Sequence, residues 1–165
     1  MEGKAMATQA FRLLQSWDTV PGRGTAGLDP SVLAAWVEDA HRLAVQAERG
    51  AVGDQYIGTI LSFAPEGPDG IWPDVAVRNV IEDMRNVHVE NGILVGVHNQ
   101  RGVTSRGMFD GGTLERELVR KYNAWSDATK LEWPRTSSLL RQIARSFGNS
   151  ARHLDEQAER TDWEY

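Results

Sequence analysis

The fold is decided by residues 133–160, WPRTSSLLRQIARSFGNSARHLDEQAER, in which apolar side chains recur every three or four positions. That spacing places them on one face of an α-helix. The face consists of Leu139, Leu140, Ile143, Ala144, Phe147, Ala151, Leu154 and Ala158. Proline suits the first helical turn, because its missing N–H has no helical acceptor there. We therefore predict a long helix from Pro134 to about Arg160, with room for a bend at Gly148.

The same periodicity predicts helices upstream. Asp29 is a good N-cap and Pro30 fits the first turn after it. Trp72-Pro73 and Trp133-Pro134 repeat this start signal, each with a tryptophan that can fold back as a hydrophobic staple. The predicted helices cover residues 5–17, 30–49, 54–63, 71–87 and 113–129. Between the first two, the glycine-rich stretch 18–29 (DTVPGRGTAGLD) predicts a flexible loop.

Residues 88–98 are ambiguous between a helix and a short strand. Their apolar side chains fit either period, and Gly92 and Gly96 weaken a helix. A helix is favoured, because the flanking segments are helical and no second strand is evident to pair with a lone one.

These patterns predict an all-α fold, either an irregular helical bundle or a short α-solenoid-like stack of about six to seven helices. A length of 165 residues fits one domain of ordinary size. We therefore expect residues 1–165 to form a single all-α domain, either complete or as a segment of a longer chain.

Composition excludes several classes of protein. The chain has no cysteine, which rules out disulfides, thiolate metal sites and cysteine nucleophiles and favours a cytoplasmic location. It also lacks the apolar run of about 20 residues that a membrane span needs, so no membrane partner is expected. The four histidines lack metal-ligand spacing, and we predict neither a metal nor a cofactor.

The net charge of −5 is unevenly distributed along the chain. Residues 101–152 carry ten Lys and Arg against five Asp and Glu, whereas the flanking segments are acidic. An acidic partner such as a nucleic acid or nucleotide would bind this basic region. The alternative is that the basic region pairs with the acidic remainder of the fold.

The most distinctive polar segment is the loop RGVTSRG at residues 101–107. Arg101 and Arg106 flank Thr104 and Ser105, so guanidinium, hydroxyl and backbone N–H groups could surround a phosphate, or the loop could contact a partner. The loop lacks the spacing of a Walker A motif. It could equally be a structured connector.

Two further features are candidate binding sites. Arg141, Arg145 and Arg152 form a basic edge beside the apolar face of the last predicted helix, where Arg141 and Arg145 are the candidate contact residues. Trp163, in the acidic tail, is the one tryptophan without a predicted structural role, and it could anchor a partner. The alternative for the arginines is pairing within the helix, as between Arg152 and Glu156.

No coherent catalytic set is evident. A small enzyme would have to use His98 and Asp110 as an acid–base pair beside the arginine loop, and nothing in the sequence fixes their separation. No G-x-S-x-G motif occurs, and the only G-x-G-x-x-G, at residues 22–27, lacks a βαβ context. We therefore predict no catalytic residue.

The stretch from RGVTSRG through WPRT-x-x-LLR-x-IA to AR-x-x-D-x-x-AE resembles the helical terminal regions of large bacterial multidomain proteins. The resemblance implies a non-catalytic helical module. The leading hypothesis is therefore a helical scaffold or protein-interaction module of a bacterial-type multidomain system, with a protein partner or another domain of a larger chain. The alternatives are a nucleic-acid or nucleotide-binding domain using residues 101–152, and a small enzyme with a site near residues 98–110.

Overall fold

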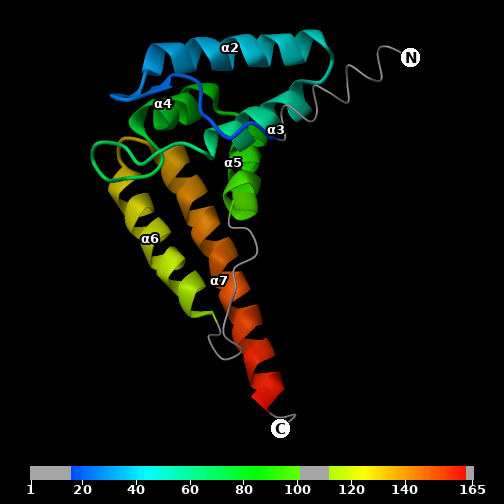
Figure 1. Cartoon of the computed structure of the whole chain (residues 1–165), viewed down its shortest axis with the longest axis vertical. Helices are drawn as coiled ribbons and strands as arrows, with labels where there is room; N and C mark the ends of the chain where they lie inside the picture. The colour runs from blue at the N-terminus through cyan, green and yellow to red at the C-terminus, as the bar shows by residue number, and fades with distance from the viewer. Residues whose placement is uncertain (1–15, 101–111, 163–165) are drawn as a thin grey trace.

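The computed structural model describes residues 16–100 and 112–162 and confirms the all-α fold. Within these ranges six helices pack against one another (Figure 1). They are α2 (Pro30–Gln46), α3 (Gly50–Leu61), α4 (Val75–Met84), α5 (Val87–Gln100), α6 (Thr113–Thr129) and α7 (Pro134–Asp162). The helix predicted at residues 5–17 lies almost wholly outside the described residues.

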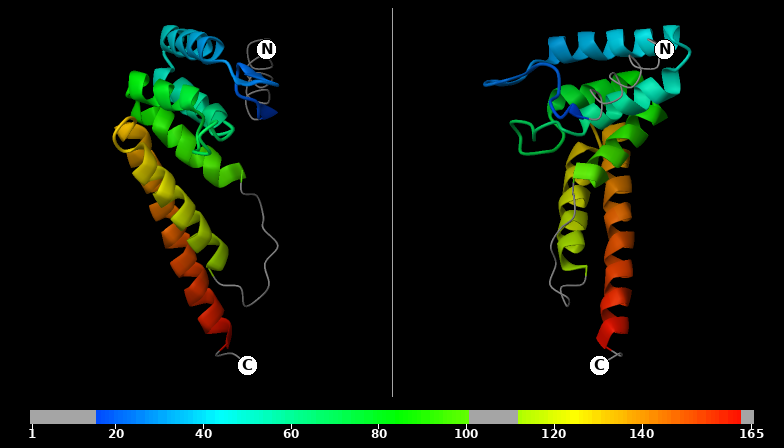
Figure 2. Two further views of the ribbon diagram at one scale, coloured as in Figure 1. Left: turned by 90° about the vertical axis from the view of Figure 1, so that its left-hand side faces the viewer. Right: turned by 45° about the vertical axis from the view of Figure 1, so that its right-hand side comes forward.

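The helices form two groups. Helices α2 to α5 stack across one end of the molecule, and α6 and α7 form a long antiparallel hairpin that extends away from them (Figures 1 and 2). The hairpin joins the stack through contacts of α7 with α4 and α5. None of the described helices is both long and apolar enough to cross a membrane.

Residues 18–29 contain the main departure from the prediction. Two two-residue strands, β1 (Arg23–Gly24) and β2 (Gly27–Leu28), pair antiparallel with Arg23 opposite Leu28. Gly27 has a positive φ of 116°, which a side chain would strain. The stretch predicted as a flexible loop is therefore a short hairpin that leads into α2.

Local start signals placed the beginnings of two helices correctly, whereas a third helix begins four residues later than predicted. Helix α2 begins at Pro30, and the Asp29 carboxylate accepts hydrogen bonds from two backbone N–H groups of its first turn. Helix α7 begins at Pro134. Helix α4 begins at Val75, because Asp74 is its N-cap.

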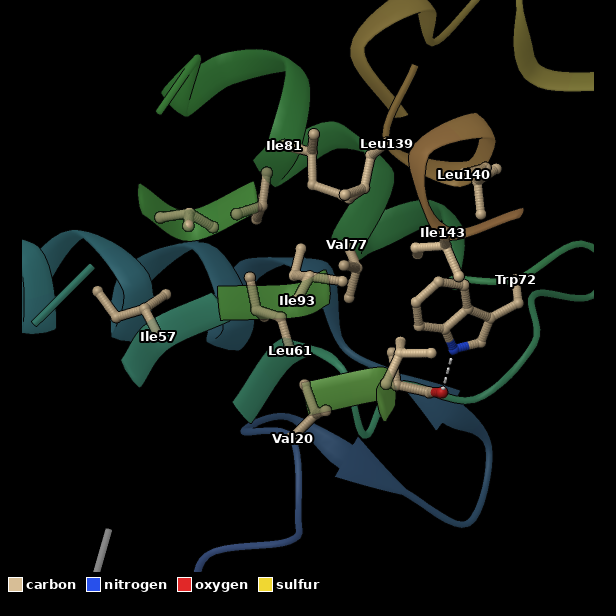
Figure 3. Close-up of a cluster of buried hydrophobic side chains, with 14 of the residues drawn as sticks. Val20, Ile57, Leu61, Trp72, Val77, Ile81, Ile93, Leu139, Leu140 and Ile143 are labelled. Atoms are coloured by element: carbon tan, nitrogen blue, oxygen red, sulfur yellow. Dashed lines mark hydrogen bonds between the residues drawn. The ribbon is translucent and has the colours of Figure 1, made fainter. Parts of the chain in front are cut away.

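Trp72 is a core residue, which corrects its predicted role as a staple. The indole is buried, and its Nε1–H donates to the carbonyl oxygen of Ala64 at 2.9 Å (Figure 3). The Trp72-Pro73 peptide bond is cis. Burying an indole with its N–H satisfied contributes apolar area at no polar cost.

Residues 88–98, which were ambiguous between a helix and a strand, are helical, as favoured. The two glycines of this segment have a packing role. Helix α5 crosses α3 closely. A Cβ at Gly92 would overlap the backbone of Gln55 on α3, and a Cβ at Gly96 would overlap the side chain of Ser62, the C-cap of α3. The two glycines thus lower the helix propensity of α5 while allowing the two backbones to approach. Tertiary packing outweighs propensity at this crossing.

The hydrophobic core lies where the stack meets α7 (Figure 3). Leu139, Leu140 and Ile143 of α7 are at most 1% exposed and point toward the stack. Burial of each such side chain contributes about 1.5–3 kcal/mol. The N-terminal part of the predicted apolar face of α7 therefore packs at the junction that joins the two groups of helices.

Polar groups reinforce this junction. The fully buried Arg78 of α4 forms two hydrogen bonds to Asp69, at 2.7 and 2.9 Å, and its guanidinium lies 4.9 Å from the centre of the Trp133 ring. Glu82 accepts from the backbone N–H of Thr136 at 2.9 Å, in the first turn of α7. A carboxylate at a helix N-terminus is favourable because of the exposed N–H groups there.

Candidate functional site: an arginine groove between α6 and α7

Four arginines line a groove along the α6–α7 hairpin. Arg116 comes from α6, and Arg141, Arg145 and Arg152 come from α7. The groove has a volume of about 490 Å³. The structure therefore brings Arg141, Arg145 and Arg152 of the predicted basic edge together with Arg116, which the sequence did not single out. We call this feature the arginine groove.

Small residues make room for the groove. Ala144, Gly148 and Ala151 recur on the side of α7 that faces α6, and all three line it. A Cβ at Gly148 would be 3.8 Å from the Val119 side chain, so the packing at this position leaves space. The spacing of four and three residues places these small residues on one strip of α7, beside the row of arginines.

Two of the arginines are held by carboxylates. Arg116 pairs with Asp155 at 2.7 Å, and Asp155 also accepts from the backbone N–H of Gly112 at 2.8 Å. Arg141 pairs with Asp127 at 3.4 Å. These side chains are about half exposed, so each pair contributes about 1 kcal/mol or less. Their main effect is to orient the guanidinium groups.

Arg145 lies between these two pairs. Its side chain is exposed and makes no hydrogen bond or ion pair with another residue of the described ranges. Arg152 donates to Asn149, a neutral group, so its charge is not neutralised by that contact. The centre of the groove therefore presents two guanidinium groups that carry full charge.

A second hollow adjoins the first. It has a volume of about 310 Å³, and Lys130 and the first turns of α7 line it. Arg141 and Arg145 line both hollows. A ligand that follows α7 would meet a row of cations over several turns.

The remaining predicted site residues fall elsewhere. Arg101, Thr104, Ser105, Arg106 and Trp163 lie outside the described residues, as does Asp110. The predicted partner of Asp110, His98, packs its ring against Phe147 at a centroid distance of 4.8 Å.

The sequence analysis missed a polar cluster that joins α2 to α3. The buried carboxylate of Asp54 makes a 2.6 Å hydrogen bond with His41 Nδ1 and accepts one from Asn86 Nδ2 at 2.7 Å. Such an arrangement fixes an imidazole ring, as in acid–base catalysis. His41 also lines a hollow of about 340 Å³, whose other described lining residues include no hydroxyl group. No sequence signal indicates that these three residues meet.

Among residues 16–100 and 112–162, no group of three or more His, Asp or Glu side chains is placed to hold a metal ion. No protein-family model, curated protein or solved structure matches this chain. The arrangement of charges in the arginine groove therefore carries the functional argument by itself.

Proposed function

We propose that this chain is a non-catalytic helical interaction module whose arginine groove binds an acidic segment of a protein partner. The observation that carries the proposal is that four arginines from two helices line one groove. Arg116 and Arg141 are each paired with a carboxylate, whereas the Arg145 side chain has no such partner among the described residues. Guanidinium groups bind carboxylates through paired hydrogen bonds, so a groove of this kind suits aspartate and glutamate side chains.

The distribution of negative charge favours a short peptide over a nucleic acid. Asp155 and Asp127 lie beside Arg116 and Arg141 and would repel a continuous phosphate backbone. An acidic peptide can place its carboxylates on Arg145 and Arg152 between them. The chain as a whole is also acidic, at −5, which opposes non-specific binding to a polyanion.

The partner in this proposal is a separate protein or another domain of a longer chain, as the resemblance to multidomain proteins implies. The cysteine-free composition supports a cytoplasmic setting. The fold serves as a rigid support, because the apolar face of α7 that is buried in the junction is separate from the arginines that line the groove.

The proposal is tested by the binding of a fluorescent, glutamate-rich peptide to the full chain, measured by fluorescence anisotropy at about 50 mM and about 200 mM salt. The control ligand is the same peptide with glutamine in place of glutamate. We expect the acidic peptide to bind and the neutral one not to, with affinity falling as salt rises. Arg145→Gln should weaken binding about tenfold, or about 1.4 kcal/mol.

Arg120→Gln is the matched control, since Arg120 is exposed on α6 but does not line the groove. It should leave affinity unchanged, and both variants should melt at the wild-type temperature. Equal losses from the two variants, or no binding at low salt, would contradict the proposal. A short DNA duplex that binds more tightly than the peptide, and through Arg145, would replace it with the nucleic-acid alternative.

A further inference from the structure

A second groove, between α3 and α5, has the opposite character. Its volume is about 860 Å³. None of its described lining residues carries a charge. They are Trp17, Val52, Gln55, Tyr56, Thr59, Phe63, Val95, Gly96, Asn99 and Gln100. Its apolar members come from α3, from α5 and from the chain beside them, and a groove with apolar side chains on two helices can hold an amphipathic helix.

Two valines face this groove from opposite sides while partly open to solvent. Val52 of α3 is 51% exposed and Val95 of α5 is 41% exposed. A hollow lined by apolar side chains from two helices is a larger contiguous apolar surface than an isolated exposed valine. Covering it would remove this surface from water at a gain of about 25 cal/mol per Å².

The chain itself leads into the groove. Trp17 lines it, and its position is fixed by packing against Trp36 at a centroid distance of 6.1 Å and by a 2.6 Å hydrogen bond from Nε1 to the carbonyl oxygen of Thr19. Trp17 is also the last member of the apolar stripe that the sequence predicts for residues 5–17. The described part of the chain therefore begins beside the groove wall.

We propose that this groove is a helix-binding site and that residues 5–15 of the same chain occupy it. The stripe Ala7, Ala10, Phe11 and Leu14 has the spacing of one helical face, and Arg12 falls on the opposite face. Eleven helical residues span about 16 Å, close to the roughly 18 Å of the twelve-residue α3. The uncharged groove thus receives an apolar stripe of matching length.

The absence of cysteine allows a direct test in the full chain. Leu14→Cys is combined with Val52→Cys in one variant and with Val95→Cys in a second, because both valines are partly exposed and tolerate a smaller side chain. After mild oxidation, the yield of intramolecular disulfide is measured by mass spectrometry of proteolytic fragments. Circular dichroism verifies that each variant folds.

Two controls define the background. Arg12→Cys combined with the same valine replacements places the thiol on the opposite face of the same segment. Leu14→Cys with Leu131→Cys tests random collision, since Leu131 is 91% exposed at the turn between α6 and α7. We expect at least one groove pair to form the intramolecular disulfide about tenfold faster than either control.

Groove pairs that cross-link no faster than the controls would overturn the proposal. Disulfides found mainly between two molecules on a non-reducing gel would also overturn it, because the occupant would then be a second copy of the chain. This test is independent of the arginine groove, so its outcome does not affect the proposed function.

Discussion

Gly58 of α3 and Gly92 of α5 pack directly against each other, so that a Cβ added to either would lie 2.9 Å from the Cα of the other. Real Cβ atoms do not approach a backbone so closely, and the same added atoms would overlap the carbonyl oxygens of Val89 and Gln55. The crossing of α3 and α5 therefore requires glycine on both helices.

Alanine at this crossing should destabilise the fold. Gly92→Ala forces the two helices apart, and we expect the free energy of unfolding to fall by about 3 kcal/mol or more. The measurement is urea denaturation followed by circular dichroism. Gly148→Ala is the matched control, since it meets only ordinary contact at 3.8 Å and should gain up to about 1 kcal/mol from helix propensity. Similar effects from both would contradict this account of the crossing.

The ion pair between Asp69 and Arg78 should make stability depend on acidic pH. Hydrogen bonding from the Arg78 guanidinium holds the pKa of the Asp69 carboxyl below its usual range. Because the folded-state pKa is lowered, the stabilisation is present above the unfolded-state pKa of about 3.9 and is lost as pH falls through the folded value. Asp69→Asn should therefore be less stable than wild type at neutral pH.

Urea denaturation at a series of pH values from neutral to about 3 checks this expectation. The difference in unfolding free energy between wild type and Asp69→Asn should shrink toward the acidic end. A difference that stays constant with pH would show that the carboxylate charge of Asp69 does not contribute.

Tyr122 should make the stability of the fold depend on pH in the alkaline range. Burial raises the pKa of its phenol to about 12. The neutral form is thus favoured in the folded chain, and the stabilisation is present below the usual value of about 10 and is lost as pH rises toward about 12. Wild type should lose stability relative to Tyr122→Phe between about pH 9 and about pH 11. Thermal melts at both pH values measure the difference, and parallel melting curves would rule it out.

The cluster of Asp54, His41 and Asn86 should mainly stabilise the fold. Asp54→Ala removes hydrogen bonds to His41 and Asn86 across α2, α3 and the start of α5, and we expect a loss of about 1–3 kcal/mol of unfolding free energy. Asp83→Ala, an exposed change near the same hollow, should cost about 0.5 kcal/mol or less. Equal losses in urea denaturation would disprove the role of the cluster.

Local signals in the sequence were enough to place most helices. Asp29-Pro30 and Pro134 mark helix starts because capping and the missing proline N–H act within one turn. The hairpin at residues 23–28 was missed, because strands of two residues have no hydrophobic period to detect. Gly92 counted against a helix in the sequence, because its low helix propensity is a local property. The structure shows why glycine is needed there: it packs against α3, and that contact cannot be predicted from the local sequence.

In the candidate site, too, residues on one helix could be predicted from the sequence, whereas contacts between helices could not. Arg141 and Arg145 could be identified because they share one face of one helix. Arg116 could not, because its place in the groove depends on how α6 packs against α7. The His41–Asp54 contact likewise depends on the angle between two helices, which no local pattern encodes.

The aromatic residues at the junction give this protein an internal optical reporter. Trp72 and Trp125 lie 6.4 Å apart, with Tyr122 edge-on to both, at the place where the hairpin meets the helical stack. Separation of the hairpin from the stack would expose these indoles to water and shift their emission. With Trp17, Trp36 and Trp163 replaced by phenylalanine, only Trp72, Trp125 and Trp133 would remain, and fluorescence would follow the opening of this joint.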